Sequence, residues 1–255
     1  MRLGLFHLIV FSFVLNPICG QTIVNTETLM AQNDSGLVWT AGVGGDLSKG
    51  NSNVLDVSID GGATWMRGRH GWKLIASYNQ LAQDGETIQG NAFGHLHWDV
   101  GDALRFQFFG FAQTSANNVL LLNQRSLFGI GGKRRLITAD KGWLALSYGC
   151  FWEHESYDAE AVEPDRQLLR SSAIISAQFN PSPHVSTRLT TYLQSDFKRW
   201  ADSRAYVEWI WDVSITEKVA FEWNLGVRWD GEPHANLNAW DLGSTMGLRF
   251  GFNGN

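Results

Sequence analysis

Residues 218–229 read KVAFEWNLGVRW, and their alternation decides the fold. Apolar side chains from Val219 to Trp229 occupy every second position, a period that is typical of a β-strand. One face of this strand carries two tryptophans and a phenylalanine, whereas the other carries Glu222 and Arg228. In a transmembrane barrel, lipid covers one face of each strand and a polar interior lies behind the other. The stretch therefore predicts a membrane-spanning β-strand.

The same alternation recurs between residues 36 and 252, interrupted by clusters of turn-forming residues. We predict strands at 36–49, 53–67, 71–83, 87–100, 103–115, 119–137, 142–154, 168–179, 184–197, 204–215, 218–230 and 239–252. The 27 glycines and 44% hydrophobic content suit one large all-β domain. The predicted fold class is all-β, a single transmembrane antiparallel up-and-down β-barrel of about twelve strands.

The connections between these strands predict an orientation. Those that follow even-numbered strands are short turn clusters, at 67–71, 100–102, 138–142, 180–183 and 216–218. Those that follow odd-numbered strands are longer, at 84–86, 155–167, 198–203 and 231–238, except for the first hairpin at 49–53. Outer-membrane barrels have short periplasmic turns and longer external loops. We therefore expect both mature termini to lie in the periplasm.

Tryptophans cluster near the two ends of the predicted strands. Near the short turns lie Trp65, Trp72, Trp98, Trp143 and Trp211, and near the longer loops lie Trp152, Trp200, Trp229 and Trp240. Tryptophan is enriched at both membrane–water interfaces. The alternative is a soluble β-sandwich core, which does not require tryptophans at strand ends. The positions predict two membrane-interface aromatic belts.

The chain begins with a segment that we exclude from the barrel. Residues 1–20 have the features of a cleaved signal peptide, with Arg2 as their sole charge and an apolar run at 3–15. Lipidation at Cys19 is the alternative. Residues 21–35 are predicted to form a short periplasmic lead, and the predicted location of the protein is the outer membrane of a Gram-negative bacterium.

Cleavage would leave Cys150 as the one cysteine, so no intramolecular disulfide is expected. It would also remove Arg2 and change the formal net charge from −5 to −6. An acidic chain gives no reason to expect a nucleic-acid partner.

The end of the barrel carries an assembly signal. Residues 245–252 read TMGLRFGF, in which Gly247, Phe250 and Phe252 fit the pattern that the outer-membrane assembly machinery reads. A tail of three residues, 253–255, follows. We therefore expect the barrel-assembly machinery and outer-membrane lipid as partners.

Residues 120–136 read LLLNQRSLFGIGGKRRL, an apolar run followed by Arg125, two spaced glycines and basic residues. This stretch resembles the salt-induced outer-membrane protein family, bacterial β-barrels of unknown function. Residues 23–25 and 170–172 look like members of that family from Bacteroidota-type bacteria. The resemblance implies an outer-membrane barrel and no catalytic residue. Members carry an acidic residue shortly before the arginine, where this chain has asparagine and glutamine, so a carboxylate partner there is not implied.

The face opposite the tryptophans is predicted to line the lumen with two charged walls. The basic wall comprises Arg105, Arg125, Lys133, Arg135, Arg170 and Arg188. The acidic wall comprises Asp46, Asp56, Asp60, Glu208, Asp212, Glu222 and Asp241. Opposed charges create a transverse field that sorts polar solutes. The alternative is that the charges pair across a filled interior, to which Lys73, Arg228 and Arg249 would contribute.

A catalytic function is not expected. His95, His97 and Asp99 alternate on the lumen face, and Ser77 and Asn79 lie on the neighbouring strand, but no nucleophile motif or third metal ligand at a fixed spacing accompanies them. The acidic run at 153–165 is read as a solvated loop, with divalent-cation binding as the alternative. We expect no cofactor and no metal site.

The predicted function is a narrow passive channel for ions or small polar solutes. A non-conducting envelope-structural or stress-response barrel is the alternative, and a barrel hydrolase is a third, weaker one. The two main hypotheses differ in whether the charged walls stay open or neutralise each other.

Overall fold

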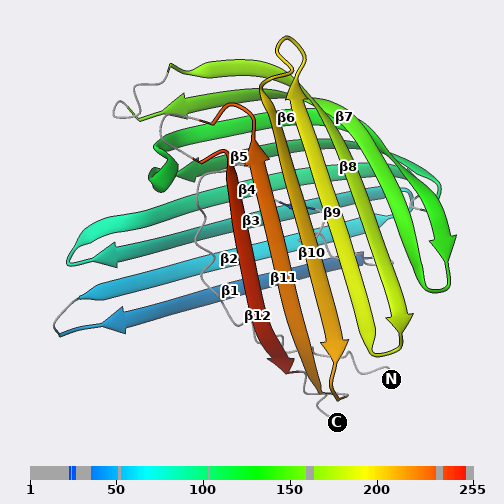
Figure 1. The fold of residues 1–255 in the computed structure, drawn as a ribbon, viewed down its shortest axis with the longest axis horizontal. Coiled ribbons are helices and arrows are strands. Elements are labelled where there is room, and N and C mark those ends of the chain that lie inside the picture. The colour runs from blue at the N-terminus through cyan, green and yellow to red at the C-terminus, as the bar shows by residue number, and fades with distance from the viewer. Residues whose placement is uncertain are drawn as a thin grey trace.

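The computed structural model describes residues 23, 25, 26, 36–50, 53–102, 104–158, 164–216, 218–233 and 238–250, with the backbone alone for 249 and 250. Within these ranges the chain forms twelve strands and a short 3-10 helix, η1 (Figure 1). The strands are β1 (Gly36–Ser48), β2 (Val54–Arg67), β3 (His70–Gln83), β4 (Glu86–Asp102), β5 (Phe106–Asn117), β6 (Leu122–Ala139), β7 (Gly142–Tyr157), β8 (Arg166–Ser182), β9 (Val185–Asp196), β10 (Ser203–Ser214), β11 (Val219–Asp230) and β12 (Trp240–Phe250), and η1 (Asn118–Leu120) precedes β6. The predicted all-β fold with twelve antiparallel strands is confirmed.

The sheet has the simplest up-and-down topology, since each strand pairs with the next one along the chain. It curls so strongly that β1 to β5 run nearly across the view in Figure 1 while β9 to β12 run steeply down it. Ladders are described for every consecutive pair from β1–β2 to β11–β12, and none joins β1 to β12 among the described residues. The described part of the chain has no helix long and apolar enough to cross a membrane.

The connections mostly follow the predicted lengths. Those after even-numbered strands span two to four residues, whereas those after β7, β9 and β11 span six to nine. The connection after β3 is shorter than predicted, because Asp84 and Gly85 form a two-residue turn with φ of 51° and 89°. An Asp-Gly pair favours such a hairpin, since both positions require a positive φ.

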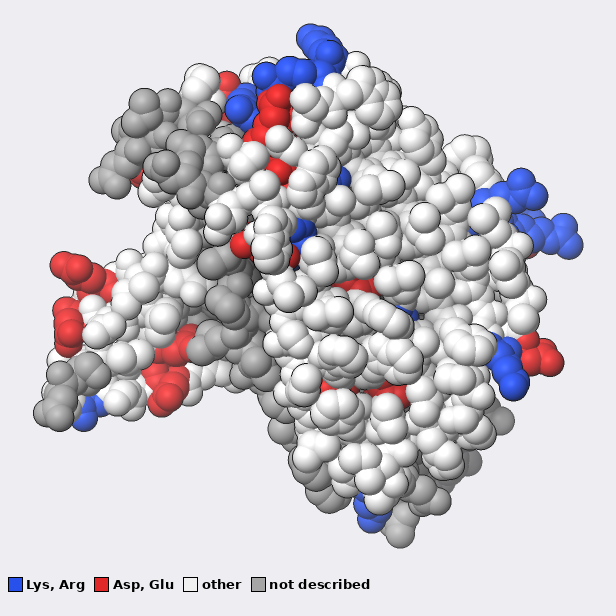
Figure 2. All heavy atoms as spheres, in the orientation of Figure 1, with Lys and Arg blue, Asp and Glu red and all other residues white. Residues whose placement is uncertain are grey.

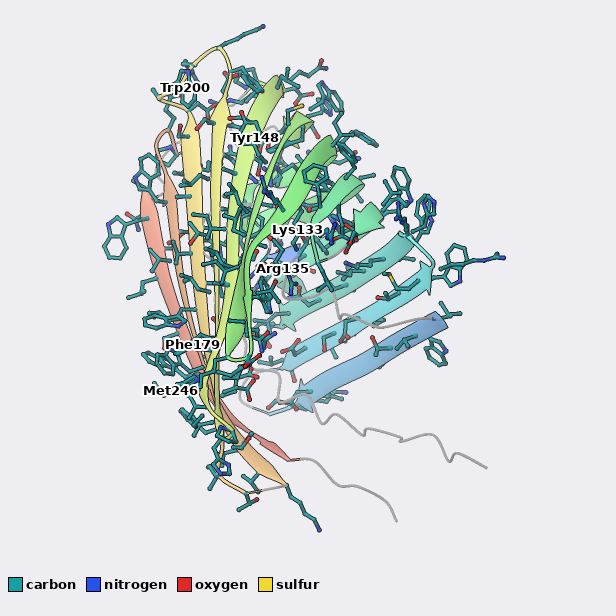
Figure 3. All side chains as sticks on the ribbon, turned by 90° about the vertical axis from the view of Figure 1, so that its right-hand side faces the viewer. Lys133, Arg135, Tyr148, Phe179, Trp200 and Met246 are labelled. Atoms are coloured by element: carbon teal, nitrogen blue, oxygen red, sulfur yellow. The ribbon has the colours of Figure 1, made fainter. Side chains whose placement is uncertain are left out.

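The two faces of the sheet differ sharply in chemistry. Large apolar side chains cover the convex face, where Val43 is 83% and Ile130 is 68% exposed. Figure 3 places Phe179 and Met246 on this outer side, and it places Lys133 and Arg135 on the concave side. Figure 2 likewise shows a surface with few charges between the ends of the strands. Polar groups are instead buried on the concave face, so the predicted inside-out chemistry is found.

Candidate functional site

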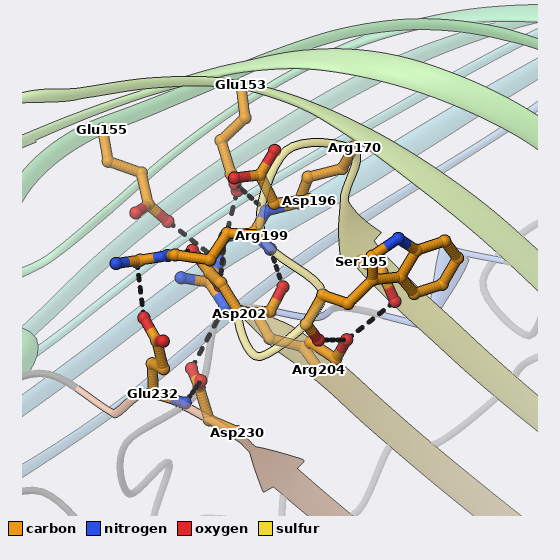
Figure 4. A network of polar contacts seen from close by, with 12 residues as sticks. Glu153, Glu155, Arg170, Ser195, Asp196, Arg199, Asp202, Arg204, Asp230 and Glu232 are labelled. Atoms are coloured by element: carbon orange, nitrogen blue, oxygen red, sulfur yellow. Dashed lines mark hydrogen bonds and ion pairs between the residues drawn. The ribbon is translucent and has the colours of Figure 1, made fainter.

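Three buried arginines meet four buried carboxylates in the interior between β6 and β11. Figure 4 shows the four carboxylates with two of the arginines, Arg170 and Arg204. We call this group the interior charge network; it comprises Arg125, Glu153, Glu155, Arg170, Asp202, Arg204 and Asp230. Every one of these side chains is at most 7% exposed. Buried charges are rarely found without partners, because transfer from water to a low-dielectric interior is costly.

Glu153 on β7 lies at the centre of the network. It accepts a hydrogen bond from Arg125 Nε at 2.6 Å, pairs with Arg170, and lies 3.3 Å from Nη1 of Arg204. One carboxylate on β7 therefore connects β6, β8 and β10, and no two of these three strands are adjacent in the sheet.

The second carboxylate of β7, Glu155, completes the pairing of the arginines. Its Oε1 lies 3.1 Å from Nη1 of Arg204 and 3.2 Å from Nε of Arg125. The hydroxyl of Tyr157 donates to its other oxygen at 2.7 Å. Asp230 on β11, directly opposite Arg204 in the ladder, accepts from Nε of that arginine at 3.1 Å.

The network also holds the connection between β9 and β10. Arg170 donates to the carboxylate of Asp202 at 2.7 Å and to its backbone carbonyl at 2.8 Å. Arg199 in the same connection pairs with Glu232 in the connection after β11. The longer loops are thus tied to the barrel interior and to each other.

Two members of the predicted basic wall, Arg125 and Arg170, belong to this network. Glu153 belongs to the predicted solvated loop at 153–165, but it lies within β7 and faces inward. Arg204, Asp202 and Asp230 were not among the predicted wall residues. Arg204 has the same parity as Tyr206 and Glu208, so extending the alternation to the strand ends would have identified it.

The other predicted basic residues have separate environments. Arg105 lies in the turn after β4 with a side chain 87% exposed, so it lines no wall. Arg135 on β6 lies over the ring of Trp143, with its guanidinium carbon 4.6 Å from the centroid, and Lys133 is half-buried on the same face. Arg188 lies 4.0 Å from Asp212. These four members of the predicted basic wall therefore lie outside the interior charge network.

The predicted acidic wall is distributed over both edges of the sheet. Asp46 and Asp56 are directly opposite each other in the β1–β2 ladder, and Asp60 lies on the same face of β2. No ion pair of these three aspartates is found among the described residues. Like charges directly opposite on neighbouring strands destabilise a sheet, so this cluster has a stability cost.

The remaining acidic residues lie on β10, β11 and β12. Glu222 is opposite Asp212, and Asp241 is opposite Arg228. Glu208 accepts from Asn224 at 3.1 Å and from the hydroxyl of Tyr206 at 3.0 Å.

Three residues of the predicted lead lie inside the barrel. Ile23, Asn25 and Thr26 are 3%, 7% and 9% exposed. The amide of Asn25 donates to Glu208 at 2.5 Å and accepts from the hydroxyl of Tyr192 at 3.1 Å. Ile23 packs in one apolar cluster with two tyrosines of β9 and β10. These residues therefore occupy part of the lumen; the signal peptide at 1–20 and the tail at 253–255 lie outside the described residues.

A layer of aromatic side chains on β4 to β7 lines the interior on the side that faces the lead residues. Phe109 is directly opposite Gly131, and Phe111 is directly opposite Gly129. A Cβ atom at either glycine would overlap the ring that lies over it, which explains the spaced glycines of this stretch.

The two histidines belong to this layer. The rings of His97 and Phe109 stack with centroids 5.5 Å apart, and those of His95 and Phe111 with centroids 5.7 Å apart. His97 also contacts Asp99, which pairs with Lys73 at 3.0 Å. Among the described residues no group of three His, Cys, Asp or Glu could hold a metal ion.

A cavity of about 60 Å³ lies between the aromatic layer and the lead. It is lined by both histidines, Gln113, Gln194, Tyr192 and Thr26, among others. Ser77 and Asn79 lie on the neighbouring strand β3, opposite Phe93 and Asn91 of β4, and neither lines this cavity.

Seven of the nine tryptophans of the predicted belts lie on the outer face of the strands. Trp65, Trp72 and Trp98 are side by side in consecutive ladders near the short turns. Trp229 is opposite Trp240 at the other end. The outward tryptophans also include Trp152 and Trp211, and Trp200 lies in the connection after β9 with 70% exposure.

Trp143 differs from the prediction. It has the parity of inward-facing Ala145 and packs under Arg135. Of the assembly signal, Gly247 is on β12 opposite Glu222, the backbone of Phe250 pairs with Val219, and Phe252 lies outside the described residues.

Residues 41–252 match the family described as "Protein of unknown function, DUF481". No curated protein matches the sequence. Among solved structures, the chain is similar to one titled "NanC porin structure in rhombohedral crystal form", with a TM-score of 0.50 and 10% identity over 82% of this chain and 98% of that one. It is also similar to the translocator domain of the autotransporter NalP from Neisseria meningitidis, with a TM-score of 0.41 and 10% identity over 89% and 92% of the two chains. At this identity the porin likeness concerns the fold.

Proposed function

Since the chain belongs to the DUF481 family, we propose its role from the geometry of its interior: an outer-membrane barrel that forms a narrow passive path for cations or small polar solutes. The apolar convex face and the aromatic belts support the membrane location. The short turns would lie in the periplasm, and pairing of β1 with β12 would close the barrel.

The proposal rests on a difference between inward-facing arginines and inward-facing aspartates. Arg125 and Arg170 are buried and neutralised by carboxylates, whereas Asp46, Asp56 and Asp60 face the interior without a described cation. The interior therefore carries an acidic surface along β1 and β2 in place of the two opposed charged walls that were predicted. Such a surface attracts cations and repels anions.

Conductance of refolded residues 21–255 in a planar bilayer tests this proposal. We expect small conductance steps with cation preference, which Asp56→Lys combined with Asp60→Lys should abolish or reverse. Asp140→Asn, in the exposed turn after β6, is the matched control and should leave the selectivity unchanged. Cation preference that survives the double substitution would contradict the proposal.

A non-conducting structural barrel is the second candidate. The interior charge network and the lead residues favour it, because both fill the lumen along β6 to β11. Silence from a verified, heat-modifiable barrel would support this candidate. Conductance that appears with Ile23→Ser combined with Asn25→Ala would instead indicate a channel closed by its own lead.

We infer that the barrel is not an enzyme and needs no cofactor. This inference is supported by the stacking of both histidines on phenylalanines and by the lack of a nucleophile motif around them. Assembly by the barrel-assembly machinery, the absence of a nucleic-acid partner and a response to salt remain predictions. Protein levels before and after a salt upshift would test the last of these.

A further inference from the structure

An arc of exposed cations lies at the short-turn ends of β2 to β7. We call it the basic arc; it comprises Arg67, Arg69, Arg105, Arg134 and Lys141. Figure 2 shows a group of basic atoms at the edge of the molecule where the β2–β3 and β4–β5 turns lie in Figure 1. Asp102 and Asp140 are the described exposed carboxylates in the same turns, and Asp102 lies 3.9 Å from Arg105. Five cations against two carboxylates leave the arc positive.

The arc is held together by backbone hydrogen bonds between its turns. Gly101 donates to the carbonyl of Arg69 at 3.0 Å, and Arg135 donates to the carbonyl of Arg105 at 3.1 Å. The ladder also places Arg134 directly opposite Phe106, whose ring packs edge-on against Phe108. The backbones of these turns therefore have fixed positions relative to the outer face of the sheet.

The arc borders the aromatic belt formed by Trp65, Trp72 and Trp98. Arg67 is two residues beyond Trp65 on the same face of β2, about 7 Å along the strand. The ring of His70 stacks on Trp98 with a centroid distance of 6.0 Å. Interfacial tryptophans lie at the level of lipid headgroups, so the cations just beyond them lie at the level of the phosphates.

From this juxtaposition we propose that the basic arc binds anionic phospholipid headgroups, of the phosphatidylglycerol type, in the periplasmic leaflet. Arginine suits this role because its guanidinium donates two parallel hydrogen bonds to a phosphate. The inference rests on the proposed membrane location and orientation, but not on the channel. Loss of conductance would leave it intact.

Fluorescence quenching by brominated lipid tests the proposal with the folded barrel. Vesicles would contain phosphatidylcholine mixed with phosphatidylglycerol, and the bromine would be placed on one lipid or the other. We expect stronger quenching by the brominated phosphatidylglycerol. The triple variant Arg67→Gln, Arg69→Gln, Arg105→Gln should weaken this preference about fivefold per removed charge.

Lys49→Gln combined with Lys198→Gln is the control, since both lysines are exposed at the opposite ends of the strands. These substitutions should leave the lipid preference unchanged. Equal quenching by both lipids in the unmodified barrel, or an unchanged preference in the triple variant, would overturn the proposal.

A second measurement distinguishes the source of the phosphate. In a Cys150→Ser background in intact cells, Lys141→Cys should resist a membrane-impermeant maleimide, whereas Lys198→Cys should react. Labelling of Lys141→Cys from outside would place the arc against lipopolysaccharide and overturn the assignment to the periplasmic leaflet.

Discussion

Arg170 and Glu153 form an ion pair in which both side chains are fully buried, and each has a further partner of opposite charge. They are diagonal neighbours in the β7–β8 ladder, because Arg170 is opposite Phe151, two residues before Glu153. The pair forms because both side chains project from neighbouring strands into the same interior, where neither is exposed to solvent.

The first prediction concerns the stability of this pair. Arg170→Ala would leave Glu153 and Asp202 as buried carboxylates that have lost a cation, which costs about 3–5 kcal/mol. Urea denaturation of the refolded barrel should show a correspondingly lower midpoint. Arg105→Ala, at an 87% exposed side chain, is the control and should change stability little. Equal midpoints for the two variants would contradict the buried network.

The second prediction concerns the lead. In a Cys150→Ser background, Asn25→Cys should react at least tenfold more slowly with a water-soluble maleimide than Lys49→Cys, because residue 25 is buried and residue 49 is exposed. Adding Tyr192→Ala should speed the reaction at residue 25 by removing a group that packs around the lead. Equal rates at residues 25 and 49 would show that the lead lies outside the barrel.

The third prediction concerns the glycines under the aromatic layer. Gly129→Ala should destabilise the barrel by about 1–3 kcal/mol, because the new methyl group overlaps the ring of Phe111. Phe111→Ala in the same chain should recover part of this loss, and a double-mutant cycle would measure the coupling. Gly243→Ala meets open space and serves as the control. Additive effects at positions 129 and 111 would contradict the predicted overlap.

The fourth prediction distinguishes a lipid-facing sheet from a soluble one. Ile130→Arg places a charge on the outer face in the middle of β6, where the side chain is 68% exposed. In a bilayer this should cost about 2–4 kcal/mol, whereas on a water-exposed surface it should cost almost nothing. Reversible folding into vesicles measures the difference. Leu104→Arg, in the turn after β4, is the matched control and should have a small effect in both settings.

The strands and their two faces could be predicted from the sequence to within three residues at each boundary. In KVAFEWNLGVRW the parity of Trp223 and Glu222 already separates the outer face from the inner one. Side chains alternate strictly along a strand, so this information is local and survives without knowledge of the neighbours. The same alternation places Asp56 and Asp60 on the inner face.

The alternation along a strand could not predict which groups the inward charges contact. Arg125 was assigned to a basic wall because parity gives its direction but not the residue it meets. Its carboxylate partners lie on the next strand, and Arg204, which shares them, belongs to β10. Such partners depend on register and on the curl of the whole sheet, which are set by long-range pairing.

The lead shows the same difference between what local sequence predicts and what tertiary contacts decide. The sequence of residues 21–35 is short and polar, and it predicts a periplasmic segment, whereas Asn25 is bound inside by Glu208 and Tyr192. The sequence by itself determined the outer and inner faces of the strands, apart from residues such as Trp143, because the side-chain alternation of a strand is local. Only the tertiary structure decided which inward groups neutralise one another and what fills the lumen, because those contacts join residues up to 183 positions apart.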